Sequence, residues 1–439
     1  MAGDFDVQPL GTVAKVRSGY AFKSDDMGAV GLPVIKIKNV VPPTVDITDC
    51  ERVPEEVISS IPRVERFELK EGDTLIAMTG ATVGKVGKFP RTHERHFLNQ
   101  RVGKVYLTEP DAADYRYIYY ILSQDTYVRQ MFGIADGSAQ ANISGSQIES
   151  LEVPLPPLVE QKAIAAVLGA LDDKIELNRR MNATLEALAR ALFQSWFVDF
   201  DPVRAKLDGR PPAALDPATA ALFPEHLEDS PLGHIPKGWT AQRLPDAIEV
   251  NPRRTLKGGT IAPYLDMKNL PTQGHSAEEV IDREFSSGTK FQNGDTLLAR
   301  ITPCLENGKT GYVDFLEDGQ VGWGSTEYIV LAPKPPLPPQ FGYLLARSDA
   351  LRTHAIQNMT GTSGRQRVPS ECFHNFWLAV PPPDIARRFN ELTAPLMAKI
   401  KANSTESRTL ATLRDTLLPK LLSGELSVAD ATLTTGANL

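Results

Sequence analysis

Several features are scarce in this 439-residue sequence, and each scarcity excludes a class of protein. Only three cysteines occur (Cys50, Cys304 and Cys372), and they lie far apart, so neither a disulfide framework nor a CxxC metal knuckle is supported. No window reaches the roughly 18 apolar residues that a membrane span needs. The first residues, MAGDFDVQPLG, lack the basic and apolar regions of a signal peptide. We therefore expect a cytoplasmic protein with no membrane partner.

Catalytic motifs are scarce as well. The chain has neither a glycine-rich cofactor loop nor the Asn/Asp-Pro-Pro-aromatic motif of a DNA methyltransferase. TGATVGKV (79–86) has too few residues between its glycines and has Val86 where a phosphate loop needs Ser or Thr, so we interpret it as a turn. His93 and His96 have no third ligand at a suitable spacing. Glu68-Leu69-Lys70 could be half of a nuclease site, but the second half of the chain has no matching acid. We predict no catalytic residue and no metal site.

Basic residues are outnumbered, since 47 Lys and Arg face 54 Asp and Glu and the net charge is -7. This balance argues mildly against binding to nucleic acid, because phosphate neutralisation needs cations. The basic residues are unevenly distributed along the chain, however. The segment from Lys85 to Lys104 holds six basic residues and a single acid, Glu94.

The chain contains an internal repeat. Comparison of the sequence with itself at an offset near 225 residues gives matches in a conserved order along most of its length. The preserved order indicates a tandem duplication. The matching pairs are LPVIKIKNV (32–40) with APYLDMKNL (262–270), EGDTLIA (71–77) with NGDTLLA (293–299), Gly84-Lys85 with Gly308-Lys309, and LEVPLPP (151–157) with LAVPPP (378–383).

Each copy ends in a helical heptad pattern. A rod of about 40 residues at 1.5 Å each is about 60 Å long and outreaches a domain of about 150 residues, so we expect the two apolar seams to bury against one another. Asn178 and Asn403 then fix the register of the pair. The seams are Leu171, Ile175, Asn178, Asn182, Leu185, Ala189, Leu192 and Trp196 in the first copy, and Leu396, Ile400, Asn403, Ser407, Leu410, Leu413, Leu417 and Leu421 in the second.

Two prolines interrupt the second heptad segment. Pro395 stands where the first copy has Ala170, so we expect a late start or a kink there. Pro419 stands within the last heptad and leaves the end of that helix undetermined.

The segments before each helix are β-rich, with short alternating or β-branched runs separated by Gly, Pro and Asp. A shorter helix and a polar loop follow in each copy. We predict the α+β class, with an ordered connector between the copies because its aromatic and Leu residues can dock. The predicted divisions are a first domain (1–157), a helix (158–200), the connector (201–238), a second domain (239–382), a second helix (383–426) and a disordered tail (427–439).

Several motifs together resemble the specificity subunit of a Type I restriction-modification system. They are PLPPLVEQKAIAAVLGALDDKIELNRRMN, LFQSWFVDFDPVRAK, LFPEHLEDSPLGHIPKGW and LRDTLLPKLLSGEL, and the resemblance extends from LGTVAKVRSGYAF to Leu426. It implies two target recognition domains, each reading one half of a split, asymmetric DNA sequence. It also implies that the long helices form an antiparallel coiled coil that sets the gap between the half-sites.

The resemblance further implies a division of labour among subunits. Two methyltransferase subunits would dock on the helices and carry S-adenosylmethionine, and restriction subunits would bring ATP- and Mg-dependent activity. This chain would hold no cofactor of its own and would bind double-stranded DNA as a non-catalytic subunit. Two alternatives stay open: a DNA-modifying or DNA-cleaving enzyme in its own right, and a coiled-coil scaffold that does not touch DNA.

Polar residues in loops between strands are the candidates for DNA contact, because Arg pairs with guanine and Asn or Gln with adenine. Two pairs of lysines occupy corresponding positions in the two copies: Lys38 with Lys268, and Lys85 with Lys309. A residue common to two domains that recognise different sequences cannot discriminate between those sequences, so we interpret these lysines as phosphate clamps. The candidates are Ser18, Tyr20, Lys38, Thr79, Lys85, Arg101, Gln140 and Asn142 in the first domain and Arg253, Lys268, Arg300, Lys309, Arg365, Gln366 and Arg367 in the second.

Overall fold

The computed structural model describes residues 5–135, 141–362 and 364–435. It divides into two compact units, one formed by residues 1–174 with 409–439 and the other by residues 175–408. Each unit therefore combines one α+β domain with part of each of two long helices, α5 (Leu158–Phe197) and α11 (Pro383–Leu422). None of the helices in these described ranges has the length and apolar character that crossing a bilayer would require.

The first domain contains two small sheets. One has the strand order β2-β8-β5-β6 and is antiparallel throughout, and the other has the order β4-β3-β7, in which β3 and β7 are parallel. A further pair, β1 with β9, joins the two ends of the domain. The strands are β1 (Val7–Pro9), β2 (Ala14–Ser18), β3 (Leu32–Ile35), β4 (Glu51–Val53), β5 (Thr74–Ala77), β6 (Val86–Lys88), β7 (Phe97–Leu98), β8 (Val102–Leu107) and β9 (Glu152–Pro154).

The second domain repeats this topology. Its sheets have the orders β13-β20-β17-β18 and β15-β14-β19-β16, β14 and β19 are parallel, and β12 pairs with β21. Apart from β16, which has no counterpart strand in the first domain, corresponding strands occupy corresponding places, which confirms the duplication inferred from the sequence. The strands are β12 (Thr240–Arg243), β13 (Ile248–Val250), β14 (Ile261–Leu265), β15 (Ile281–Glu284), β16 (Thr289–Phe291), β17 (Thr296–Ala299), β18 (Thr310–Tyr312), β19 (Gly322–Gly324), β20 (Tyr328–Pro333) and β21 (Trp377–Val380).

Short helices accompany the sheets in both copies. The stretch predicted as one helix in the first domain forms two, α2 and α3, because the chain turns at Ser123, whose hydroxyl donates to the Tyr120 carbonyl at 3.1 Å. The second domain has the same division, with Ser348 capping the second helix. The helices are α1 (Glu55–Ser59), α2 (Tyr115–Leu122), α3 (Asp125–Ala135) and α4 (Gly145–Glu149) in the first copy, and α8 (Leu244–Ala247), α9 (Pro339–Ala346) and α10 (Asp349–Gln357) in the second.

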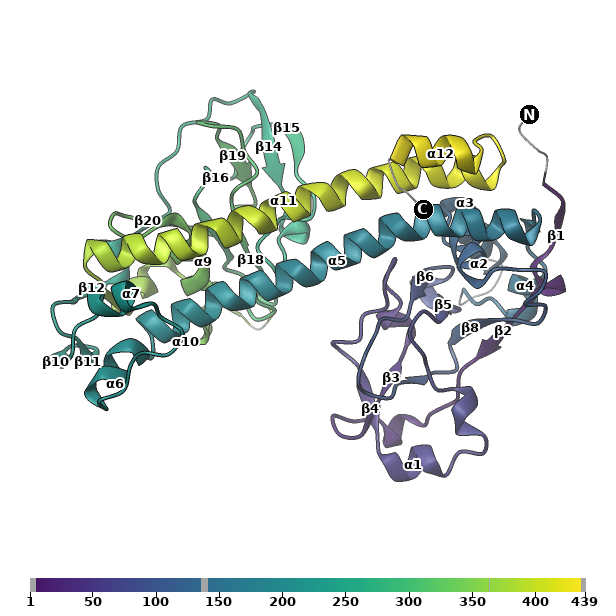
Figure 1. Ribbon diagram of the computed structural model, residues 1–439, viewed down its shortest axis with the longest axis horizontal. Helices are drawn as coiled ribbons and strands as arrows, with labels where there is room; N and C mark the ends of the chain where they lie inside the picture. Colours follow the sequence, from purple (N-terminus) through teal and green to yellow (C-terminus); the bar gives the residue numbers. More distant parts are fainter. Residues whose placement is uncertain (1–4, 136–140, 363, 436–439) are drawn as a thin grey trace. The chain divides into compact units, whose positions relative to one another are not determined.

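The long helices α5 and α11 lie side by side and run antiparallel (Figure 1). In the second unit, Asn178 contacts Ser407, Asn182 contacts Ser404, and Trp196 packs on Phe389. Residue numbers therefore increase along α5 in the direction in which they decrease along α11. Both helices are 40 residues long. The paired helices predicted from the heptad seams are therefore present.

Each domain packs its own helices onto this pair. In the first unit, Tyr117 and Ile121 of α2 share a buried cluster with Leu168 of α5 and Leu417 of α11. In the second unit, Phe341 of α9 packs on Phe193 and Phe197 of α5, in a buried cluster that also holds Phe389 of α11. The cores of the domains are thus continuous with the helical seam.

Polar groups interrupt the seam in the second unit, as the two asparagines predicted. Asn178 is fully buried and its amide donates to Glu406 Oε2 at 2.8 Å and to Ser407 Oγ at 3.3 Å. The Asn403 amide donates to Asn182 Oδ1 at 2.9 Å. A slip by one turn would leave these groups without partners inside the seam, so they favour a single register.

A second polar cluster lies in the first unit around Asp172 of α5. Its carboxylate accepts from Lys88 Nζ of β6 at 3.1 Å, from the Tyr120 hydroxyl of α2 at 2.6 Å and from Arg414 Nη1 of α11 at 2.8 Å. The Asp172 side chain is only 15% exposed. Burial alone would raise its pKa, but Lys88, Tyr120 and Arg414 outweigh it and hold that pKa below its usual value.

The connector between the copies is ordered, as its docking residues predicted. It contains α6 (Asp201–Leu207), α7 (Pro217–Leu222) and a hairpin of β10 (Leu227–Ser230) and β11 (Gly233–Pro236). Phe223 stacks edge-on against Trp196 of α5, with ring centroids 4.9 Å apart.

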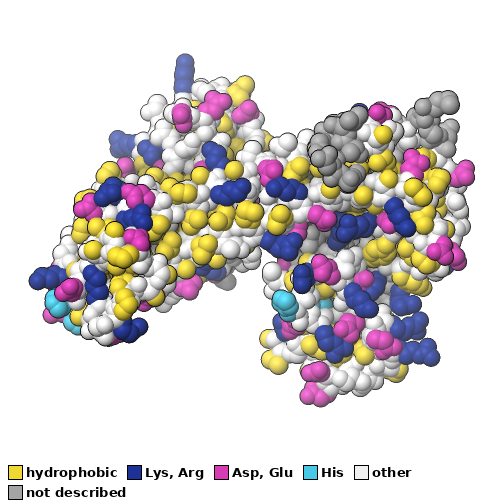
Figure 2. All heavy atoms as spheres, viewed as in Figure 1, with side chains coloured by type: hydrophobic (Ala, Val, Ile, Leu, Met, Phe, Trp, Pro, Cys, Tyr) yellow, Lys and Arg dark blue, Asp and Glu magenta, His cyan; other side chains and the backbone are white. Residues whose placement is uncertain are grey.

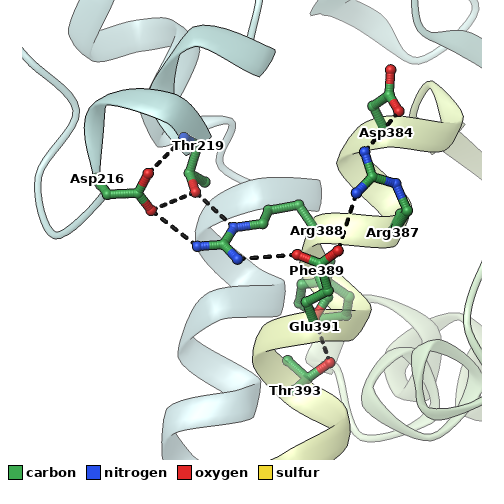
Figure 3. Close-up of polar contacts among 8 residues, drawn as sticks. All are labelled: Asp216, Thr219, Asp384, Arg387, Arg388, Phe389, Glu391 and Thr393. Carbon is green, nitrogen blue, oxygen red and sulfur yellow. Dashed lines mark hydrogen bonds and ion pairs between the residues drawn. The ribbon is translucent and has the colours of Figure 1, made fainter.

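An arginine of α11 holds the connector in place (Figure 3). Arg388 donates to Thr219 Oγ1 at 2.7 Å, to Asp216 Oδ2 at 3.0 Å and to Glu391 Oε2 at 3.0 Å. Asp216 also caps α7, because it accepts from the Thr219 amide at 2.9 Å. The start of α11 is thereby tied to the connector.

Two expectations about the C-terminal region are wrong. Helix α11 runs unbroken through Pro395 and Pro419, whose rings both lie on its exposed side, and neither proline delays its start or ends it. The tail predicted to be disordered contains a helix, α12 (Val428–Thr435). Ser427 accepts from the Asp430 amide at the start of α12, and Ala431 is buried in the core of the first unit. Leu426 and Val428 pack against the same core, so apolar contacts dock the segment.

We expect Asn403→Ala to loosen the helix pair, because Asn182 Oδ1 loses its donor inside the seam. Asn182 is partly buried, and an unmet acceptor there costs about 1–2 kcal/mol, which corresponds to roughly 5–30-fold faster opening. Hydrogen–deuterium exchange of residues 175–182 and 400–408 would measure the change. Lys399→Ala, at an exposed position of the same helix, should change exchange by less than about twofold. Equal exchange in the two variants would contradict the role of Asn403.

We expect Asp172→Asn to lower the stability of the first unit by about 3 kcal/mol at neutral pH, because the partly buried Lys88 loses its anion and Arg414 keeps only Asp415 as an ion-pair partner. Since the native pKa of Asp172 is depressed, its stabilising contribution is present above the unfolded pKa of about 3.9 and is lost as pH falls through the native value. The difference in melting temperature between wild type and variant should therefore narrow in acid. The neighbouring Asp173, whose side chain is 73% exposed, provides the control Asp173→Asn. A difference in melting temperature that persists in acid would show that the stabilisation by Asp172 is not ionic.

Candidate nucleic-acid interface

Three loop segments of the first domain meet at the end of strand β5. The Met78 amide donates to the Arg101 carbonyl at 3.0 Å, and the Ile143 amide donates to the Met78 carbonyl at 2.9 Å. Thr79 and Asn142 form an isolated antiparallel bridge. The structure thus brings together three of the predicted residues, Thr79, Arg101 and Asn142, although 63 positions separate the first from the last.

The second domain builds the same backbone frame at the end of β17. The Arg300 amide donates to the Glu327 carbonyl at 3.0 Å, and the Val368 amide donates to the Arg300 carbonyl at 2.8 Å. Ile301 and Arg367 form the bridge that matches the one between Thr79 and Asn142. Strand register supports the correspondence, since Ala77 opposes Val102 in one sheet and Ala299 opposes Tyr328 in the other.

The side chains on this common frame differ between the domains. We call the six corresponding positions the matched set: Met78, Arg101 and Asn142 in the first domain, and Arg300, Glu327 and Arg367 in the second. Met78 is buried whereas Arg101 and Asn142 are exposed. In the second domain Arg300 and Arg367 are partly exposed, at 32% and 41%.

An acid organises the two arginines of the second domain. Glu327 accepts from Arg367 Nη2 at 2.7 Å and Nε at 2.8 Å, and Arg300 Nε lies 3.4 Å from the other carboxylate oxygen. The hydrogen bond with Glu327 raises the pKa of Arg367 above its usual value. The Arg367 guanidinium is therefore fixed in orientation, whereas Arg300 Nε lies near the carboxylate without a hydrogen bond.

The remaining predicted residues near these loops have varied surroundings. Tyr20 packs its ring against Phe22 and Phe67, so its ring serves the core, whereas Ser18 is exposed. Arg253 and Arg365 are exposed and Gln366 is half-buried. Gln140 lies outside the described residues.

The two lysine pairs predicted as phosphate clamps occupy corresponding positions. Lys38 and Lys268 lie in matching 3-10 turns, Ile37–Asn39 and Met267–Asn269, and both are exposed. Lys38 pairs with Asp49 at 3.0 Å, and the hydrogen bond from this pair raises the pKa of the lysine.

The second lysine pair is less alike. The carbonyls of Lys85 and Lys309 accept from the amides of Ala77 and Ala299, respectively, so the backbone positions correspond. Lys85 is exposed. Lys309 instead donates to the carbonyls of Met267 and Lys268, both at 2.8 Å, and so holds the 3-10 turn in place.

Sequence reasoning missed Met78 and Glu327. A methionine or a glutamate in a loop is not a conspicuous base-reading residue. The repeat did carry a signal, because aligning RVGKVYL (101–107) with EYIVLAP (327–333) places Arg101 opposite Glu327, a reversal of charge at one position.

The motifs set aside at the sequence level all have structural roles. Gly80–Thr82 forms a 3-10 turn between the antiparallel strands β5 and β6 rather than the strand-to-helix loop that cradles phosphate. Glu68 is paired with Arg95, and His96 is buried against Phe89. Within the described part of the chain, no three His, Cys, Asp or Glu side chains gather as a metal site.

Cys50 and Cys372 are not activated nucleophiles. Burial raises the pKa of the Cys50 and Cys372 thiols to about 11, so both remain protonated at neutral pH.

Comparisons with known proteins agree with this architecture. The family described as "Type I restriction modification DNA specificity domain" matches residues 3–187. The Type I restriction enzyme MjaIX specificity subunit of Methanocaldococcus jannaschii is 25% identical over 81% of this chain and 78% of its own length. The HindI specificity subunit of Haemophilus influenzae is 23% identical over 84% of this chain and 90% of its own. In fold, the chain is similar to the crystal structure of the Type I restriction-modification S subunit from M. genitalium, with a TM-score of 0.53, 16% identity, and coverage of 95% of this chain and 96% of that one.

Proposed function

We propose that this chain, whose residues 3–187 match the family described as "Type I restriction modification DNA specificity domain", is the DNA sequence-specificity subunit of a Type I restriction-modification complex. Each α+β domain would read one half of a bipartite DNA target. The observation that carries the proposal is the matched set: one backbone frame occurs twice with different side chains on it, as two readers of different sequences require.

The chain would act without catalysis or cofactors of its own. Its relatives are named specificity subunits, and the motifs that resembled catalytic sites serve turns, ion pairs and packing. S-adenosylmethionine, ATP and Mg would bind to the partner subunits, two methyltransferase subunits and the restriction subunits. Their action on chromosomal DNA would place the complex in the cytoplasm.

The charge of the chain is compatible with this role. Figure 2 shows Lys and Arg side chains gathered along the lower right edge of the first unit, so the net charge of -7 is unevenly distributed. Partner subunits that close around the duplex would supply further phosphate contacts, while the loops of this chain would supply the contacts to base edges.

The long helices would determine the gap between the half-sites. Two antiparallel helices with a buried seam form a stiff rod, and a stiff rod fixes a distance that a flexible linker would leave variable. At 1.5 Å per residue, 40 residues correspond to about 60 Å.

Inserting seven residues after Leu177 of α5 and seven after Ser407 of α11 should lengthen the gap and leave the half-site sequences unchanged. Each heptad adds about 10 Å, which is about three base pairs of duplex. Methylome sequencing of cells that carry the variant with its partner subunits would report both the gap and the bases. Seven residues inserted after Gly209 in the connector provide the control, which should keep the native gap. Altered bases with an unchanged gap would refute the spacer role.

An exposed apolar face of α5 would dock a methyltransferase subunit. Leu177 and Leu188 are 47% and 51% exposed and eleven residues apart, which places them on one side of the helix, together with the exposed Ala191. Exposed leucines on a rigid element are typical of a protein interface.

We expect Leu188→Arg to weaken binding of the methyltransferase subunit at least tenfold while the chain still folds, because the position is exposed in the free subunit. Titration calorimetry with the purified methyltransferase would measure the affinity. Ile281→Arg on β15, where the side chain is 47% exposed, is the matched control and should bind normally. Unchanged affinity in Leu188→Arg would place the docking surface elsewhere.

A further inference from the structure

We infer that the matched set holds the specificity-determining residues of both domains and that Glu327 is a positioning residue, which aims Arg367 at a guanine in the second half-site. This inference rests on the proposed function and makes it specific. It places the base-reading side chains within the matched set, out of a much larger number of exposed loop residues; Met78 is buried and does not itself face DNA.

The backbone frame supports the assignment because it separates shared from variable features. Three backbone amide-to-carbonyl hydrogen bonds recur in both domains, all between 2.8 and 3.0 Å. In the first domain they run from Met78 to Arg101, from Ile143 to Met78 and from Gly80 to Ala141. The corresponding bonds of the second domain run from Arg300 to Glu327, from Val368 to Arg300 and from Thr302 to Gln366. A frame kept this closely presents side chains at the same places on both domains. Any difference in bases read through this frame must come from the side chains.

The chemistry of those side chains is that of base recognition. The first domain presents Arg101 and Asn142, whose groups match guanine and adenine edges respectively. The second presents Arg367, and its remaining guanidinium N–H groups suit guanine O6 and N7. The two half-sites are therefore expected to differ, which makes the whole target asymmetric.

Glu327 acts through Arg367 rather than on DNA itself. Its side chain is 23% exposed, less than the 41% of Arg367, and it contacts Arg367 through both carboxylate oxygens at 2.7–3.0 Å. Arg300 approaches the same carboxylate from the other side at 3.4 Å. The carboxylate fixes the plane of the Arg367 guanidinium and offsets the repulsion between the two arginines, so Arg367 enters the groove already oriented.

The test uses the complete complex with its methyltransferase subunits and measures binding to a library of DNA duplexes. Arg367→Ala should reduce discrimination at one guanine of the second half-site by roughly 10- to 100-fold, the range of a bidentate base contact. Glu327→Gln should reduce discrimination at the same guanine by a smaller factor. Glu327→Asp, which keeps the negative charge, should reduce it less than Glu327→Gln. Arg210→Ala in the connector, an exposed arginine outside both domains, is the control and should leave every position unchanged.

The first half-site serves as an internal check on folding. Each variant must still select the native first half-site, which shows that the protein is folded and assembled. A variant that weakens binding to all sequences equally, with unchanged preference at every base, would show a phosphate contact or a structural role and would overturn the inference. Wild-type complex with no sequence preference at all would instead overturn the proposed function.

Transfer of specificity is the stricter test. The triple substitution Arg300→Met, Glu327→Arg and Arg367→Asn gives the second domain the side chains of the first. We expect the second half-site to acquire the bases that the first domain reads through Arg101 and Asn142, with the first half-site and the gap unchanged. If the guanine preference is lost and the new bases are not acquired, discrimination depends on further positions, and the assignment is refuted.

Discussion

The mutual burial of the α5 and α11 seams is the interaction on which the rest of this structure depends. Neither helix can leave its apolar stripe in water, and each domain core continues directly into that stripe, with Phe341 of one domain and Tyr117 of the other packed against seam residues. Helix pairing and domain folding are therefore coupled. A domain separated from the pair would expose part of its own core.

The seam is not uniformly apolar, and its polar positions give it a defined register. A continuous leucine seam would be more stable, but it could pair in more than one register. The amide groups of Asn178, Asn182 and Asn403 find acceptors on the partner helix in the observed alignment. In the first unit, Asp172 connects a strand, a domain helix and both long helices in a single cluster of ion pairs and hydrogen bonds. Fixed register is what a device that measures distance along DNA would need.

Several elements could be predicted because they depend on local pattern. The heptads predicted two long helices, which begin at Leu158 and Pro383, and the repeat predicted that the two domains share one topology. Other elements were mispredicted where tertiary contacts outweigh local signals. VIKIKNV alternates like a strand, yet its second half forms a 3-10 turn around the buried Asn39, whose amide donates to two backbone carbonyls at 3.0–3.1 Å. The C-terminal tail, small and polar, contains a docked helix, because Ala431 and Val428 pack against the core of the first unit.

The sequence by itself determined the duplication, the helix pair and the class of residue that could contact DNA, since periodicity and residue chemistry are properties of short segments. It could not determine which of those residues share a surface. Arg300, Glu327 and Arg367 come from three loops, and only the antiparallel pairing of β17 with β20 and the bridge from Ile301 to Arg367 bring them within hydrogen-bond distance. Likewise, nothing in the local sequence of Lys309 distinguishes it from Lys85, because its role depends on carbonyls some forty residues away. Tertiary structure decided the site because ion pairs and backbone frames join residues that are distant along the chain.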